Sequence, residues 1–220
     1  MSDAQLEVPP RVFLLNAQQL IDTRRRVIEA DEALVAADHR LLEDAEAAMS
    51  AGPFSVVDKK TVPPSGDLHD YLSHGPYWWP DSEKEDGLPY LQRDGEVNPE
   101  CNSSDMNRLA ALCSALSTLA SAYFFSDHED FAERAGLLLR TWFLDEATAM
   151  NPHLEFGQSI PGRCTGRGIG IIDTHGFGWL VEMVGLLGAS PAWNRDDQRE
   201  LETWFGAYLD WLLQSEHGRE

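Results

Sequence analysis

The stretch DMNRLAALCSALSTLASAYFF, residues 105–125, decides the fold class. Its apolar side chains recur every three or four positions, as on one face of an α-helix: Leu109, Leu112, Cys113, Leu116, Leu119 and Tyr123. The same spacing recurs at 128–144 and 195–214, and a further helix is expected from 169 or 174 to 187. Apart from one short extended piece near 54–62, no alternation typical of strands occurs. We therefore predict an all-α fold.

Toward the N-terminus, residues 1–52 are predicted to form an arm, ending in Pro9-Pro10, followed by two helices. Asn16 is the expected N-cap of the first helix and Asp31 that of the second. The run Arg24–Arg26 lies among acidic residues, which favours a solvated helix face over a binding patch.

Two long segments interrupt the helices, at 53–104 and 145–168. The first has no helical period and is rich in Pro, Gly and Asp, yet it holds several Tyr and Trp. Loops without secondary structure longer than about 15 residues are uncommon in compact domains and are often functional. We therefore look for a site in these two loops.

The charge balance excludes several classes of function. The chain has 220 residues, with Lys+Arg 17 against Asp+Glu 37 and a net charge of −20. Nucleic-acid binding needs a basic face, so no nucleic-acid partner is expected. No run of about 18 apolar residues indicates a membrane span. The N-terminus lacks the basic and apolar regions of a signal peptide, which leaves localisation open.

The aromatic loop is the first candidate site. Tyr71, Tyr77, Trp78 and Trp79 lie close in sequence and alternate with polar side chains, including His69. Flat rings beside polar groups suit a sugar, whose apolar faces stack on Trp or Tyr. The alternative is that the rings only anchor the loop by burial.

Metal and cofactor binding are not expected. His69 and His74 with Asp70 do not match a common metal-ligand spacing. The three cysteines form no CxxC pair, which excludes a zinc ribbon. Gly166-x-Gly168 lacks the third glycine of a dinucleotide-binding loop.

The second candidate site is QSIPGRCTGRGIGIID, residues 158–173. It is glycine-rich, holds Arg163 and Arg167, and precedes a helix, a combination that suits an anion. The alternative is that both arginines pair with core acids such as Asp173.

Four stretches together resemble the alginate lyase family of polysaccharide lyases: SGDLHDYLSHGPYWWPD, GLPYLQRDGEVNPE, RTWFLDEATAMNPHLEFGQSIPGRCTGRGIGIIDT and SPAW with the later WFGAYLDWLLQSEHGRE. The resemblance covers residues 53–220, which we take as one lyase-like domain after the 1–52 arm and helices. It implies an (α/α) toroid of antiparallel helical hairpins with long aromatic loops, cleavage of an anionic polyuronate by β-elimination, and a periplasmic or secreted location.

The resemblance gives these residues expected roles. Arg163 and Arg167 are the candidates for carboxylate contact, and Trp78 and Trp79 for stacking. A lid tyrosine on the loop is expected from residue type, with Tyr77 or Tyr71 as candidates and Tyr77 as the catalytic choice. Three further substrate contacts are predicted within the loops: His69, Asn98 and Gln158.

One departure from the family pattern is visible. The family carries an Asn-Asn-His segment with a carboxylate neutraliser and a catalytic base, and no Asn-His pair occurs in these 220 residues. The toroid also needs more helices than the sequence predicts. We therefore expect an incomplete toroid, the front portion of a lyase domain, with little activity alone. A non-catalytic carbohydrate-binding domain and an α/α-barrel glycoside hydrolase using loop carboxylates remain the alternatives.

Overall fold

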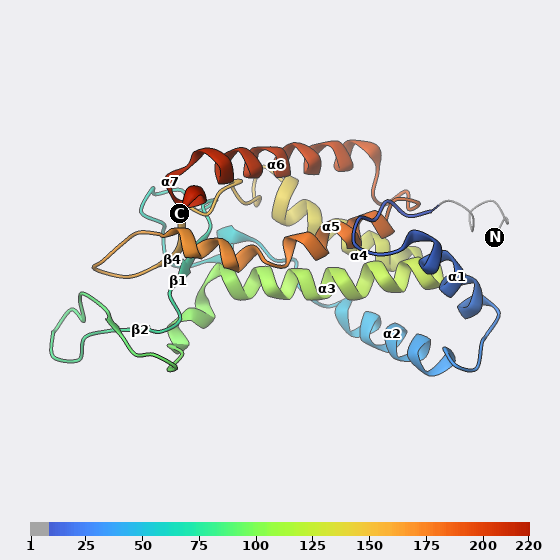
Figure 1. Ribbon diagram of the computed structural model, residues 1–220, viewed down its shortest axis with the longest axis horizontal. Helices are drawn as coiled ribbons and strands as arrows, with labels where there is room; N and C mark the ends of the chain where they lie inside the picture. The colour runs from blue at the N-terminus through green and yellow to red at the C-terminus, as the bar shows by residue number, and fades with distance from the viewer. Residues whose placement is uncertain (1–8) are drawn as a thin grey trace. The chain divides into compact units, whose positions relative to one another are not determined.

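The computed structural model describes residues 9–220 (Figure 1), so most of the predicted N-terminal arm lies outside the described residues. The chain divides into two compact units that alternate along the sequence. One comprises Met1–Pro53, Ala111–Leu139 and Gly176–Gln198, and the other Phe54–Ala110, Arg140–His175 and Arg199–Glu220. The predicted division at residues 52 and 53 stays a prediction.

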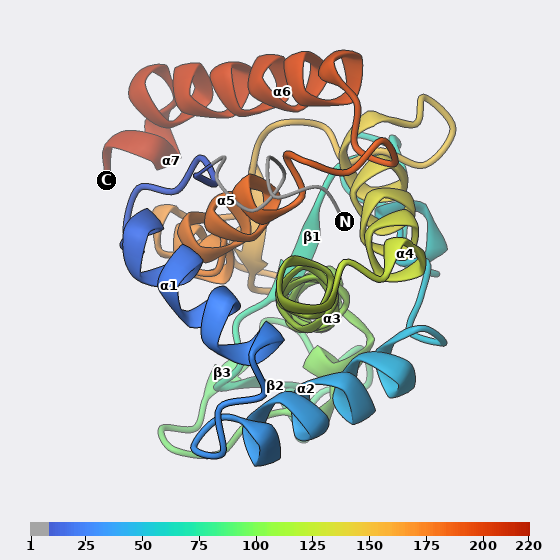
Figure 2. The same cartoon turned by 90° about the vertical axis from the view of Figure 1, so that its right-hand side faces the viewer.

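The first unit is helical, as predicted. Its helices are α1 (Ala17–Ile28), α2 (Val35–Ala48), most of α3 (Asp105–Ser126), α4 (Glu129–Leu139) and α5 (Phe177–Leu186). Viewed along α3, the other four helices lie around it (Figure 2). The apolar spacing predicted the buried face of α3 correctly: Leu112, Leu116 and Leu119 are fully buried.

Of the two predicted helix caps, one is confirmed and one is wrong. Asn16 does cap α1, since its side chain accepts a 3.0 Å hydrogen bond from the Gln19 N–H. Asp31 does not cap α2, which begins four residues later, at Val35. Instead the Asp31 carboxylate accepts from the Ala33 N–H in the preceding turn.

Arg24 is not on a solvated face. Its side chain is buried and pairs with Asp127. A buried guanidinium requires such a partner, because an unpaired buried charge is costly. Arg25 and Arg26 are exposed, as predicted.

The second unit contains short strands that the sequence did not predict. Strand β1 (Leu72–His74) pairs in parallel with β4 (Phe156–Ser159), and β2 (Trp78–Trp79) pairs antiparallel with β3 (Leu91–Gln92). Strands of two to four residues are too short to show an alternating pattern. The predicted extended piece at 54–62 is wrong, because it holds the 3₁₀ helix η2 (Val56–Asp58).

Helices and turns complete the second unit. These are η3 (Pro99–Ser103), the π-helical η4 (Arg140–Leu144), the 3₁₀ helix η5 (Gly168–Thr174), α6 (Arg195–Gln214) and α7 (Glu216–Arg219). Helix α6 has the predicted bounds. Its Trp204 ring stacks on Tyr208 and meets Phe143 edge-on at 4.8 Å, which forms the aromatic core of this unit.

Helix α3 has the length and composition of a membrane span, with a mean hydropathy of 1.5 over its best window. Polar residues interrupt the apolar ones along this helix, so no uninterrupted apolar run reveals it in the sequence. Half of that window is buried inside the molecule, and a core helix of a soluble protein passes the same test. The expectation of no membrane partner stays a prediction.

Candidate functional site

A pocket of about 410 Å³ opens in the second unit, beside strands β1 and β4. Its lining comes from three stretches: Thr61, Val62, Pro64, Leu72, His74, Ser159, Pro161, Gly162, Arg163, Cys164 and Thr165. None of these residues, all within the described chain, carries a carboxylate. Arg163 therefore supplies the positive charge in a pocket of a chain whose net charge is −20.

Arg163 is exposed and held on an aromatic ring. Its guanidinium lies 5.0 Å from the centre of the Trp78 ring, and its Nε donates a 2.7 Å hydrogen bond to the Tyr90 carbonyl. Within the described chain no carboxylate pairs with it, so the alternative of a core ion pair with Asp173 does not hold for this arginine. Stacking leaves the outer guanidinium nitrogens available to an anion.

Arg167 is held by Gln158. Its Nε donates to the Gln158 carbonyl at 2.9 Å and its Nη2 to Gln158 Oε1 at 3.0 Å. Gln158 Nε2 in turn donates to Asp173 Oδ1 at 3.0 Å. Arg167 is thus connected to Asp173 through an amide, and no described carboxylate pairs with it directly.

Gly75 explains how Arg167 and Trp78 come near each other. A Cβ at Gly75 would lie 2.7 Å from both Arg167 Nη2 and Trp78 Cδ1, closer than a real Cβ contact. The absence of a side chain at this position lets both groups pack against the same piece of backbone. Because Trp78 also carries Arg163, the two arginines approach one tryptophan.

Asp173 is the buried acceptor beneath this arrangement. Besides Gln158, it accepts hydrogen bonds from Tyr71 Oη at 3.1 Å and Ser73 Oγ at 2.5 Å. Burial and the charge of Asp173 raise the pKa of Tyr71 well above its ordinary value of 10.0. Tyr71 is fully buried, so the structure places this predicted contact residue in the support of the site.

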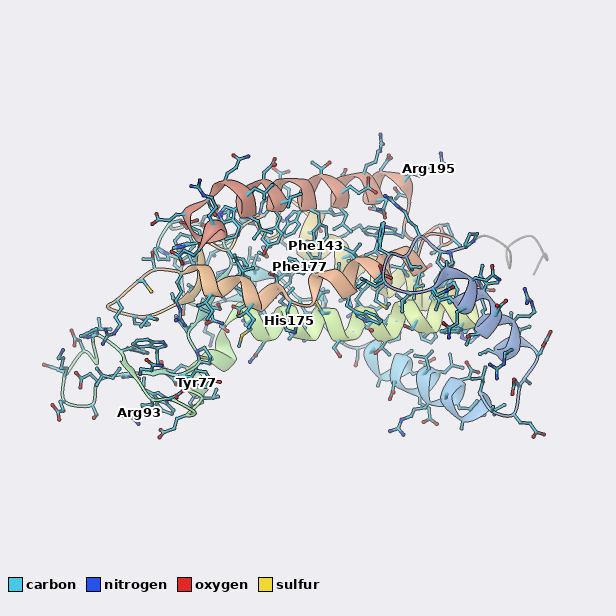
Figure 3. All side chains as sticks on the ribbon, viewed as in Figure 1. Tyr77, Arg93, Phe143, His175, Phe177 and Arg195 are labelled. Atoms are coloured by element: carbon cyan, nitrogen blue, oxygen red, sulfur yellow. The ribbon has the colours of Figure 1, made fainter. Side chains whose placement is uncertain are left out.

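The loop of β2 and β3 holds the other aromatic candidates. Figure 3 shows Tyr77 and Arg93 on this loop, and the Arg93 N–H donates to the Tyr77 carbonyl at 2.8 Å. Trp79 donates from Nε1 to the Glu96 carbonyl at 2.9 Å, and Arg93 lies 5.1 Å from its ring centre. Tyr77 is 41% exposed.

Asn98 and His69 do not line the pocket. Asn98 is buried, caps η3 and donates from Nδ2 to the Trp78 carbonyl at 2.8 Å. It therefore fixes the strand that carries Trp78. His69 is engaged through Nδ1 with the Ala149 carbonyl at 2.7 Å, which joins the two long loops.

The glycines of 158–173 serve packing. A Cβ at Gly166 would lie 1.9 Å from the Glu155 carbonyl oxygen, so only glycine fits there. The first N–H of η5, on Gly168, donates to a carboxylate oxygen of Glu220 at 2.7 Å. Glu220 therefore occupies the position predicted for an anion at this helix start, and the two arginine side chains remain the candidates for anion contact.

His74 also lines the pocket, which the sequence did not predict. In the sequence it was a candidate only for metal binding. Its Nδ1 lies 2.9 Å from Ser159 Oγ. Burial lowers the pKa of His74 below its ordinary value of 6.5, and the charge of Glu100 partly offsets this. The parallel pairing of β1 with β4 places the two residues opposite each other. Residues so distant in sequence carry no local signal of that pairing.

A sequence model of the alginate lyase family matches residues 55–220. Among solved structures, the crystal structure of an alginate lyase from Bacteroides ovatus superposes with a TM-score of 0.90 at 40% sequence identity. The match covers 96% of this chain and 56% of that chain, so this chain spans little more than half the length of that protein. No curated protein matches this chain.

Proposed function

We propose, from the premise that the chain belongs to the alginate lyase family, that it acts on a polyuronate, an acidic polysaccharide of the alginate type. Binding takes place in the pocket beside Arg163 and Trp78, and cleavage proceeds by β-elimination. The (α/α) toroid of helical hairpins expected from the family is part of the same proposal.

The observation that carries the proposal is the charge of the pocket. A chain at −20 repels a polyanion, so binding needs a local cationic site. The pocket lining has no carboxylate, and Arg163 is presented there on the face of Trp78. A guanidinium next to an aromatic ring offers both contacts that a uronate needs, an ion pair for the carboxylate and a surface for the ring.

The proposed reaction removes the C5 proton of a uronate and breaks the C4–O bond, which leaves a C4–C5 double bond and a new hydroxyl on the leaving sugar. Negative charge develops on the carboxylate during proton removal, and donors around it stabilise that charge. Arg163 and Arg167 are proposed for this role, with Gln158 positioning Arg167. Tyr77, exposed on the β2–β3 loop, is proposed as the lid tyrosine that exchanges a proton.

Two other functions compete with this one. A glycoside hydrolase of the same fold adds water and creates no double bond, and a non-catalytic domain releases no product. Ultraviolet absorbance of the unsaturated sugar distinguishes the lyase from both. Because the 220 residues contain no Asn-His pair, we expect them to form little of this product alone. We therefore test the proposal by measuring binding.

Calorimetric titration of the 220-residue chain with two oligosaccharides of equal length tests the proposal. One is a polyuronate oligomer and the other a neutral oligomer that lacks the carboxylates. We expect binding of the polyuronate and at least about tenfold weaker binding of the neutral sugar, since the ion pair with Arg163 is lost. Equal affinity for both sugars would contradict an anion-binding pocket.

A further inference from the structure

The hydrogen bonds around Ser159 fix which ring nitrogen of His74 carries the proton. Ser159 Oγ lies 2.9 Å from the Ser73 carbonyl oxygen, which can only accept, so the single hydroxyl proton of Ser159 is used there. In the 2.9 Å contact between Ser159 Oγ and His74 Nδ1, the ring nitrogen must then be the donor. His74 is therefore protonated on Nδ1.

The other ring nitrogen, Nε2, is left as an acceptor. The lowered pKa of His74 keeps the ring neutral at neutral pH, so Nε2 carries a lone pair. Nε2 has no hydrogen-bond partner in the described chain. It is not one of the buried side-chain atoms that lack a partner, so solvent can reach it. His74 and Arg163 both line the pocket, so we place the acceptor and the cation in one cavity.

Building on the proposed function, we propose that His74 is a specificity residue of the pocket: its Nε2 accepts a hydrogen bond from a free ring hydroxyl of the uronate whose carboxylate binds Arg163. A neutral imidazole acceptor repels a carboxylate and requires an O–H or N–H donor. The guanidinium is a donor only. The pair therefore complements a sugar that presents an anion and a hydroxyl, and it selects against uronates whose hydroxyls are O-acetylated.

Selection of this kind follows from the cost of an unpaired polar group. A site built to bond a hydroxyl discriminates strongly against an analogue without it, because the protein's polar atom is left without its partner. An acetyl ester has no O–H to donate. Charged and titratable groups close to His74 include Glu100 and Cys101 on η3, Arg163 and Cys164 in the pocket, and Arg167 beside the neighbouring Gly75, whereas β4 contributes none.

The test is calorimetric titration of the 220-residue chain with a polyuronate oligomer and the same oligomer after chemical O-acetylation, at neutral pH. The native chain should bind the unmodified oligomer at least about tenfold more tightly. In His74→Phe, which keeps a ring of similar size, the preference should fall to about twofold or less. His39→Phe, which changes an exposed residue on α2, should keep the native preference.

The outcomes separate this inference from the proposed function. If the native chain binds neither oligomer, both are wrong. If it binds the polyuronate and His74→Phe retains the native preference, the acetyl groups weaken binding only through their size. The proposed role of His74 is then wrong. Long-range ¹H–¹⁵N spectra of the native chain provide a check that needs no variant, and a proton on Nε2 of His74 at neutral pH would overturn the inference.

Discussion

Asp173 is the residue on which the support of the site depends. Three buried side chains from two chain segments, Tyr71, Ser73 and Gln158, donate to its carboxylate. Through Gln158 it also fixes Arg167. A single acid therefore orders the floor beneath the proposed anion site.

Replacing Asp173 by alanine should lower the free energy of unfolding by about 2–4 kcal/mol, because buried donors lose their acceptor. Urea denaturation followed by circular dichroism measures the change. Asp44→Ala, on the exposed face of α2, is the matched control and should stay within about 0.5 kcal/mol of the native chain. Equal effects of the two substitutions would contradict the role of Asp173.

At this scale the sequence predicted residue types better than residue roles. Arg163 and Trp78 were chosen as ligands, and the structure brings them together at the pocket. Tyr71 and Asn98 were chosen for the same reasons but are buried as supports. Composition indicates which side chains suit a sugar, whereas burial depends on contacts with β4 and η5, far along the chain.

Among the elements, the segment before α1 is attached to α5 by one carboxylate. Glu182 is buried, and its two oxygens accept from the Phe13 N–H at 2.6 Å and the Leu15 N–H at 3.0 Å. Gly185, one turn further along α5, lets the Arg11 carbonyl pass close to the helix. The attachment therefore needs an acid and a glycine on the same helix.

Two glycines of α5, Gly185 and Gly178, test whether the Arg11 carbonyl packs against this helix. A Cβ at Gly185 would lie 2.0 Å from the Arg11 carbonyl oxygen, so Gly185→Ala should lower the free energy of unfolding by about 1–3 kcal/mol. Gly178, on the same helix, has nothing within 4 Å of the added Cβ. Gly178→Ala should raise the stability by up to about 1 kcal/mol, as alanine favours helices. If chemical denaturation finds both substitutions stabilising, the segment does not pack as described.

The attachment through Glu182 should depend on pH. Burial of the carboxyl raises its pKa, but the N–H groups of Leu15 and Phe13 outweigh burial and hold the pKa below the ordinary value of 4.5. A lowered folded-state pKa stabilises the fold above 4.5, and this contribution is lost as pH falls through the folded pKa.

Glu182→Gln imitates the protonated acid. The difference in free energy of unfolding between the native chain and Glu182→Gln should be constant above pH 4.5 and should shrink below it. Denaturation curves across this interval measure it. A difference that does not change with pH would show that the carboxylate charge is not what holds the segment.

Elements were predictable where they are long and periodic. Helix α6 has the predicted bounds because its apolar period runs over many turns. The predicted helix at 128–144 is α4 followed by the π-helical η4, whose backbone pattern leaves no trace in residue spacing. Strands β1 and β4 were missed because their stability comes from pairing with each other and not from local preference.

For the whole molecule, the net charge and the family agree on one requirement. A chain at −20 that binds a polyuronate, as we propose for this member of the alginate lyase family, must concentrate positive charge locally. The glycine-rich loop with its two arginines predicted the place from sequence alone. The structure adds that Trp78 presents Arg163 and that no carboxylate lines the pocket.

The most direct measurement compares two charge reversals in calorimetric titrations with a polyuronate oligomer. Arg163→Glu and Arg40→Glu each take the net charge from −20 to −22, but Arg40 is exposed on α2 and does not line the pocket. We predict that Arg163→Glu weakens binding at least about tenfold, or about 1.4 kcal/mol, whereas Arg40→Glu stays within about twofold of native. Equal weakening in both variants would mean that only overall charge matters, and it would contradict a polyuronate site at Arg163.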